Sequence, residues 1–218
     1  MERKIKMEKQ VEIIHLFPTP VFLTNINRDF TKDELQLFFE DIPMMRHFEQ
    51  FANHQSKDLY LFDGFEKELK DIKKFCEHQL KNYLENVVGA NTDLAGLRIT
   101  QSWLNKTRPQ EHHRQHHHTN SYLSAVLYIC CLSNDHINFE KRSYGLYNNM
   151  EFSKKKNTEW NANVVKVGVE EGDLIIFPSW MKHDVSLNET KNRERISLSF
   201  NTFPIGEMGE YYGSHLKL

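Results

Sequence analysis

The feature that most constrains the fold is a series of short extended segments that fills the chain after Gly89. They are rich in β-branched and aromatic residues and are separated by turn-forming residues, a pattern typical of strands. The segments are Leu97–Leu104, Tyr122–Leu132, Ile137–Glu140, Val164–Val169, Leu174–Phe177 and Arg195–Phe203. Helical patterns occur only before this series. The sequence therefore predicts a mainly β, α+β fold: an antiparallel jelly roll with N-terminal helices packed on one side.

Two helices are expected in the N-terminal part. Thr31 and Glu34 form a capping box, and the helix that they begin should end before Pro43. Its apolar side would carry Leu35, Phe38 and Phe39. From Phe65 onward, apolar residues recur at helical spacing until Gly89 closes the pattern, which predicts a second, longer helix.

Two other N-terminal segments are less regular. The run Val11–Leu23 is β-rich but contains Pro18 and Pro20, so an edge strand or two short extended pieces are expected. The segment Met44–Leu61 shows no firm period and is expected to be loop or mixed structure.

Length and composition indicate one domain in a reducing compartment. The 218 residues suffice for a single core, with a helical part over about 1–90 and a jelly-roll core over about 95–204. The 28 basic and 30 acidic residues nearly balance, so no affinity for nucleic acid follows. The three cysteines form no CxxC pair, and no long apolar run is present. We therefore expect a soluble, cytoplasmic protein that binds neither nucleic acid nor membrane.

The segment that begins at Arg195 alternates strictly between polar and apolar residues. In a strand this places Arg195, Ser197, Ser199 and Asn201 on one face and the apolar residues between them on the other. An arginine on such a face can hold a carboxylate through a bidentate, charge-assisted fork, and Ser197 would lie beside it. Arg193, in a charged turn, is expected to be an ordinary surface residue.

The histidines predict a metal site. His116 and His118 form the only His-x-His spacing in the chain, and in an extended segment both rings would point the same way. His183 stands before the strand that begins at Arg195. Three such ligands on one face suit a divalent transition metal with open positions for substrate and oxygen. With Arg195 holding a dicarboxylate, the set suggests a non-haem iron oxygenase.

Two other interpretations of the histidines stay open. The pairs His112 with His116 and His113 with His117 have helical i, i+4 spacing that could bind zinc, although no HExxH motif accompanies them. Alternatively, the His-rich stretch is a polar surface loop that binds no metal.

Further pocket residues come from the earlier strands. Asn105 shares a strand face with Trp103, and Tyr128 shares one with Tyr122, Ser124 and Val126. Mixed polar and aromatic faces are typical of binding cavities, so Asn105 and Tyr128 are expected to contact the dicarboxylate that Arg195 would hold. An ordinary amphipathic strand with its polar face in water is an equal alternative for each.

Several phrases of the sequence resemble a known family. They are LFPTPVF (16–22), SWLN (102–105), HHHTNSYLSAVLYI (116–129) and FPSWMKHDVSLNETKNRERISLSFN (177–201). Together they resemble a 2-oxoglutarate and iron(II)-dependent oxygenase family of bacteria and phages. The resemblance implies a double-stranded β-helix, with iron(II) and 2-oxoglutarate bound at its open end. It also implies that His116 and His183 are metal ligands and that Arg195 pairs with the distal carboxylate of 2-oxoglutarate beside Ser197.

The sequence departs from the wider superfamily at one position. That superfamily has a carboxylate two residues after the first histidine, where this chain has His118. The third ligand is therefore His118, a carboxylate from elsewhere such as Asp184, or no protein group. We expect His118, because Asp184 should point away from His183 in an extended segment.

The expected function is an iron(II)- and 2-oxoglutarate-dependent dioxygenase, a hydroxylase in reaction type, acting on an unknown small molecule or peptide. A cupin-like three-His metalloenzyme without 2-oxoglutarate and a non-catalytic jelly-roll binding or structural protein are the alternatives. The loops Met44–Leu61 and Lys141–Trp160 would set specificity. Jelly-roll edges can pair, so a homodimer is one expected assembly.

Overall fold

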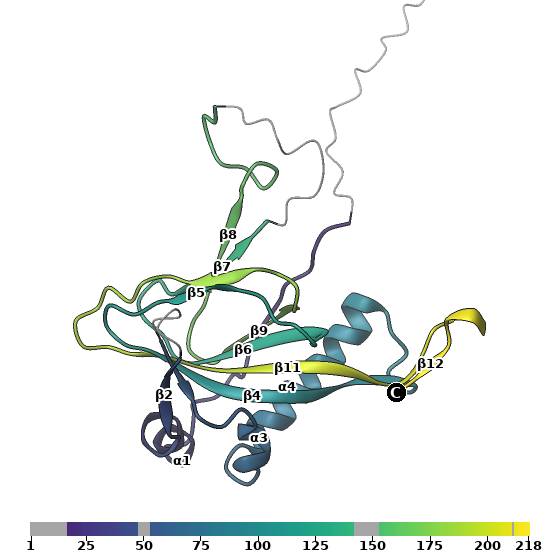
Figure 1. The fold of residues 1–218 in the computed structure, drawn as a ribbon, viewed down its shortest axis with the longest axis horizontal. Coiled ribbons are helices and arrows are strands. Elements are labelled where there is room, and N and C mark those ends of the chain that lie inside the picture. The colour runs from purple at the N-terminus through teal and green to yellow at the C-terminus, as the bar shows by residue number, and fades with distance from the viewer. Residues whose placement is uncertain (1–16, 48–52, 142–152, 211) are drawn as a thin grey trace, which may run out of the picture.

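The computed structural model describes residues 17–47, 53–141, 153–210 and 212–218. Within them the chain forms three layers: helices, an eight-stranded sheet and a four-stranded sheet (Figure 1). The strands of both sheets pair antiparallel. The predicted jelly roll with helices on one side is confirmed.

The larger sheet has the order β1, β9, β6, β11, β4, β3, β2, and β12 pairs with β11. Its strands are β1 (Phe22–Asn25), β2 (Met44–His47), β3 (Asn53–Ser56), β4 (Ala95–Thr107), β6 (Leu123–Cys130), β9 (Asp173–Pro178), β11 (Arg195–Met208) and β12 (Leu216–Lys217). The smaller sheet has the order β5, β10, β7, β8. Its strands are β5 (His113–His116), β7 (His136–Glu140), β8 (Val164–Gly168) and β10 (His183–Val185).

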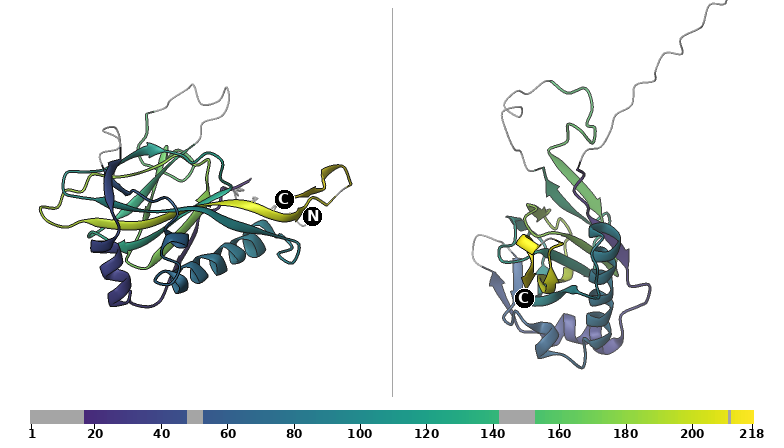
Figure 2. Two further views of the ribbon diagram at one scale, coloured as in Figure 1. Left: turned by 60° about the horizontal axis from the view of Figure 1, so that its bottom comes forward. Right: turned by 90° about the vertical axis from the view of Figure 1, so that its right-hand side faces the viewer.

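The helices cover the outer face of the larger sheet, as the views in Figure 2 show from two sides. They are α1 (Lys32–Gln36), α3 (Leu61–Gly64) and α4 (Lys70–Tyr83). Three short helices of other types accompany them: η1 (Leu37–Asp41), η2 (Leu84–Val88) and η4 (Tyr212–Ser214). No helix in the described part of the chain has the length and apolar character needed to cross a membrane.

Local sequence accounts for the ends of these helices. The Thr31 hydroxyl accepts the Glu34 N–H at 3.2 Å, and the Glu34 carboxylate accepts the Thr31 N–H at 2.8 Å, so the predicted capping box is present. The α4 and η2 segment ends at Gly89, which takes a left-handed φ of 72°. α4 begins at Lys70 rather than Phe65.

The alternation of the central strands divides the interior into two cores. Ile196, Leu198 and Phe200 of β11 are fully buried among the helix residues. Between the two sheets lies a second apolar cluster: Tyr128, Ile137, Phe139, Val169, Ile175, Phe177 and Met181. The larger sheet is therefore apolar on its helix side, while part of its other face is free to carry polar residues toward the smaller sheet.

Three local predictions can be compared with the structure. Met44–Leu61 is mixed structure, as one of the two expectations had it: its described part forms β2, β3 and the start of α3, and β3 pairs with β4, a partner remote in sequence. The expected edge strand is present as β1 at the edge of the larger sheet, but it begins only at Phe22; residues 11–16 of the predicted run lie outside the described residues. The placement of Phe39 on the apolar side was wrong: Phe39 is exposed, because Leu37 and Phe38 fill the buried side of that segment.

Candidate metal centre and pocket

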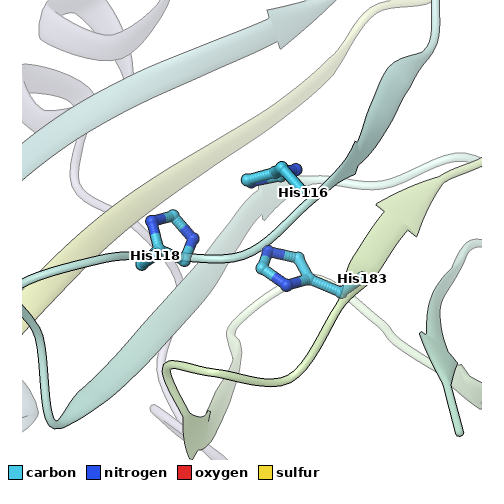
Figure 3. Close-up of side chains that lie close together, drawn as sticks. All are labelled: His116, His118 and His183. Atoms are coloured by element: carbon cyan, nitrogen blue, oxygen red, sulfur yellow. The ribbon is translucent and has the colours of Figure 1, made fainter. Parts of the chain in front are cut away.

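The smaller sheet brings the three predicted histidines together. β5 and β10 are antiparallel neighbours in which His116 lies directly opposite His183. His118 follows β5, and its N–H donates to the Ser179 carbonyl at 2.9 Å. One ligand nitrogen from each ring lies within 4.8 Å of the others (Figure 3). Two segments remote in sequence thus supply one three-histidine set.

Backbone carbonyls orient two of the three rings. His116 Nδ1 lies 2.8 Å from the Arg114 carbonyl, and His183 Nδ1 lies 3.0 Å from the Met181 carbonyl. A carbonyl only accepts, so in each ring Nδ1 carries the proton and donates it. The lone pair of each ring is then on Nε2, the atom left for a metal.

Burial favours the uncharged form of two of the three rings. The pKa of His118 is lowered to about 3, first because burial disfavours the imidazolium and then because His116 and His117 are close. The pKa of His183 is also lowered, mainly by burial and further by His116 and His118. Neutral imidazole is the form that binds metal, so at neutral pH these two rings need no deprotonation.

The donor set fits a borderline divalent metal ion, because three imidazole nitrogens lie within 4.8 Å of one another. Asp184 does not belong to it: its carboxylate accepts the Asn138 amide at 2.6 Å on the neighbouring strand β7. The helical zinc interpretation is wrong, since residues 113–116 form strand β5. His118 stays the predicted third ligand.

A pocket of about 460 Å³, including its solvent-filled mouth, adjoins the histidines. All four predicted cosubstrate contacts line it: Asn105, Tyr128, Arg195 and Ser197. Ser199 and Trp103 line it too, whereas Asn201 is hydrogen-bonded to Ser124 and Gln101. The polar face of β11 therefore meets the pocket, as its alternation predicts.

Two of these pocket side chains have unusual surroundings. The Tyr128 hydroxyl is buried and has no hydrogen-bond partner among the described residues. Burial raises the pKa of Tyr128, so it stays a donor. Arg195 is 6% exposed and forms an ion pair with Asp135, with Nη2 and Oδ1 2.6 Å apart. A buried donor without a partner is costly, which is consistent with a ligand accepting from Tyr128.

Sequence reasoning missed two residues here. Asp135 lies in the turn between β6 and β7, where Asp is common for local reasons, so nothing in the sequence signals its pairing with Arg195. His113 lines the pocket and stacks on His116, with ring centroids 4.4 Å apart. Its i, i+3 offset from His116 has no meaning until β5 is known to bend.

Solved structures share the fold. An oxidoreductase of the 2OG-Fe(II) oxygenase family from Burkholderia pseudomallei is 11% identical, with a TM-score of 0.51 over 77% of this chain and 75% of that one. The carbocyclase SnoK from nogalamycin biosynthesis is 12% identical, with a TM-score of 0.52 over 84% and 79%. HygX from Streptomyces hygroscopicus, solved with nickel and 2-oxoglutarate bound, is 12% identical, with a TM-score of 0.50 over 84% and 82%. These similarities establish the architecture.

No curated protein matches the chain in sequence. A family model does: residues 101–201 match the family described as putative 2OG-Fe(II) oxygenase. The matched segment contains His116, His118, His183 and Arg195, together with all the other residues that line the pocket. The segment that carries the candidate site is therefore similar to the 2OG-Fe(II) oxygenase family.

Proposed function

We propose that the protein is an iron(II)- and 2-oxoglutarate-dependent dioxygenase that hydroxylates a small molecule or a peptide. The observation that carries the proposal is one pocket that is lined by a converging three-histidine set and, from the larger sheet, by a buried arginine with hydroxyl groups beside it. The match of this segment to the oxygenase family supports the same chemistry.

Each residue has a defined task in this proposal. His116, His118 and His183 hold iron(II), and Arg195, Ser197, Tyr128 and Asn105 hold 2-oxoglutarate. When bound, the metal and its cosubstrate would activate dioxygen, the oxidant, so that oxidative decarboxylation of 2-oxoglutarate to succinate and carbon dioxide is coupled to oxidation of the substrate. The chain orients two of the three imidazoles through the Arg114 and Met181 carbonyls and offers the Tyr128 hydroxyl as a donor.

Anaerobic titration tests the proposal directly. Metal-free, tag-free protein would receive iron(II) and then 2-oxoglutarate, while the weak visible charge-transfer absorption of the chelated complex is recorded. The band should appear in the wild type and be lost in His183→Ala and Arg195→Met. Arg195→Met should keep its iron affinity. Iron binding without any band would refute the cosubstrate role.

A second function is favoured by one observation. Arg195 already has a carboxylate partner, Asp135, so its charge is neutralised within the protein. A three-histidine metalloenzyme that uses no 2-oxoglutarate would have this property. Turnover that does not depend on 2-oxoglutarate, with no succinate formed, would identify it.

Other observations bear on the location, domain organisation and partners of the protein. Cys76, Cys130 and Cys131 are all free, which supports a reducing, cytoplasmic location. The helices and the larger sheet share one apolar cluster, which supports a single domain over residues 1–218. Nearly balanced charge supports partners other than nucleic acid. A homodimer stays a prediction, and size-exclusion chromatography with light scattering would test it.

A further inference from the structure

Arg195 is held along one edge of its guanidinium. Nε lies 2.6 Å from Asp135 Oδ2 and Nη2 lies 2.6 Å from Asp135 Oδ1, while Nη1 donates to the Ser186 carbonyl at 3.3 Å. The side chains of Arg195 and Asp135 are 6% and 2% exposed. A guanidinium has five N–H groups. Three are engaged here, so two remain on a residue that lines the pocket.

Asp135 is itself fixed in place. Its Oδ2 accepts the Leu132 N–H and its Oδ1 accepts the His136 N–H, both at 3.2 Å. The Asp135 carbonyl also accepts the Val169 N–H at 3.0 Å. Each carboxylate oxygen therefore receives one backbone and one guanidinium donor. A carboxylate so satisfied would lose several charge-assisted bonds if it moved away.

The charges of the pocket are consistent with this arrangement. Imidazole ligands bring no charge to a metal, so a bound divalent ion would keep its full charge, because the three-histidine set contains no carboxylate. Arg195 adds one positive charge and Asp135 removes one. With a divalent metal bound, the pocket would then carry a positive charge equal in size to the negative charge of a dicarboxylate. The metal ligands include no carboxylate, and the carboxylate of this site, Asp135, pairs with Arg195 instead.

We propose that Asp135 is a positioning residue for cosubstrate binding. It holds Arg195 by the Nε and Nη2 edge, so that the two remaining N–H groups are presented to the distal carboxylate of 2-oxoglutarate. This inference rests on the proposed function. Without Asp135 the buried guanidinium would be an unpaired charge and would turn toward water. Binding would then require the arginine to be ordered again, which lowers affinity.

The test compares two ligands in four proteins and one control variant. 2-Oxobutyrate shares the 2-oxo acid end of 2-oxoglutarate but lacks the distal carboxylate. Dissociation constants of both would be measured anaerobically on iron(II)-loaded wild type, Asp135→Asn, Arg195→Met and the double variant, with metal affinity and Tm recorded for each. Asp173→Asn is the matched control, because Asp173 also accepts a turn N–H, from Glu170 at 2.8 Å, and an amide N–H, from Asn25.

Asp135→Asn should lower the affinity for 2-oxoglutarate about 10-fold. Its affinities for 2-oxobutyrate and iron(II) should stay within about twofold of the wild-type values. In the Arg195→Met background, Asp135→Asn should not lower the affinity for 2-oxoglutarate further. Asp173→Asn should change the affinity for neither ligand. Tighter 2-oxoglutarate binding by Asp135→Asn would show instead that Asp135 competes with the ligand. Equal weakening of both ligands would indicate a merely structural role. Either result overturns the inference.

A measurement on the wild type avoids any folding defect of the variant. In zinc(II)-substituted protein, the Arg195 Nε–H resonance should be protected from exchange with water and should persist when 2-oxoglutarate is added. Its loss on ligand addition would mean that the pair with Asp135 opens, against the inference. If the wild type binds no 2-oxoglutarate at all, the proposed function fails and the inference falls with it. If the wild type binds 2-oxoglutarate and Asp135→Asn binds it with the same affinity, only the inference about Asp135 is overturned and the proposed function stands.

Discussion

At the scale of single residues, the metal centre depends on hydrogen bonds that orient two of its three imidazole rings. His116 and His183 each donate Nδ1–H to a carbonyl two residues earlier in the chain. His118 is held differently, between the His183 ring at 5.2 Å and the Trp103 ring at 5.6 Å, by centroid distance. The ligand geometry is thus set by short-range backbone contacts and by ring packing.

Single substitutions should separate ligands from neighbours. His183→Ala and His118→Ala should each lower iron(II) affinity by at least about 100-fold, because even residues that only support a ligand change affinity by 10–100-fold. His117→Ala is the matched control, since His117 is exposed and lies outside the three-histidine set. Asp184→Asn should bind iron normally. Loss of iron in Asp184→Asn with retention in His118→Ala would reverse the assignment of the third ligand.

The buried histidines also predict a pH dependence of the metal-free protein. His118 and His183 have folded-state pKa values below the ordinary 6.5, so below that pH the unfolded chain binds more protons than the folded one. Their contribution to stability is complete above about pH 6.5 and is lost as the pH falls below it, for His118 as the pH approaches about 3. Urea unfolding of chelator-treated protein between pH 7 and pH 5 should show this loss. His118→Gln should flatten the slope by up to about 1.4 kcal/mol per pH unit; equal slopes would contradict the shift.

At the scale of elements, β11 serves both the core and the site because its side chains alternate. Ile196, Leu198 and Phe200 pack toward the helices, and Arg195, Ser197 and Ser199 face the pocket. Pairing with β4 on one side and β6 on the other fixes this register. A slip by one residue would exchange the two faces, so folding of the core also fixes the position of the arginine.

Substitutions at neighbouring positions of β11 should therefore affect different properties, one the stability of the fold and the other the binding of 2-oxoglutarate. Leu198→Ala removes a fully buried side chain and should lower the free energy of unfolding by about 2–5 kcal/mol, measured by urea unfolding. Ser197→Ala should lower it by less than about 1 kcal/mol, because it opens no apolar cavity. It should nevertheless weaken 2-oxoglutarate binding. Comparable destabilisation by both would mean that Ser197 does not face the pocket.

The strand faces and the three histidines could be predicted because their information is local: alternation places Arg195 and Ser197, and the His-x-His spacing places His116 and His118. The pairing of Asp135 with Arg195 could not, since it joins a turn and a strand 60 positions apart. The β2 and β3 strands were missed for a similar reason. Their four-residue lengths carry no clear period, and β3 is fixed by pairing with β4.

At the scale of the whole molecule, the proposed ligands connect the two sheets. His116 and His183 lie on the smaller sheet, whereas Arg195 and Ser197 lie on β11 of the larger one. Metal alone would join only segments at the smaller sheet. A 2-oxo acid with a distal carboxylate would reach from the metal to β11 and hold both walls of the pocket together.

Stepwise ligand addition tests this connection. Iron(II) and then 2-oxoglutarate should each raise Tm under anaerobic conditions, and a ligand present at 100 times its Kd contributes about 2.7 kcal/mol. Hydrogen exchange should slow in β5 and β10 with iron, and in β11 only when 2-oxoglutarate follows. 2-Oxobutyrate at equal saturation is the control, because it has no distal carboxylate to reach Arg195. Equal protection of β11 by both ligands would mean that the cosubstrate does not bridge the sheets, and that Arg195 acts within the larger sheet alone.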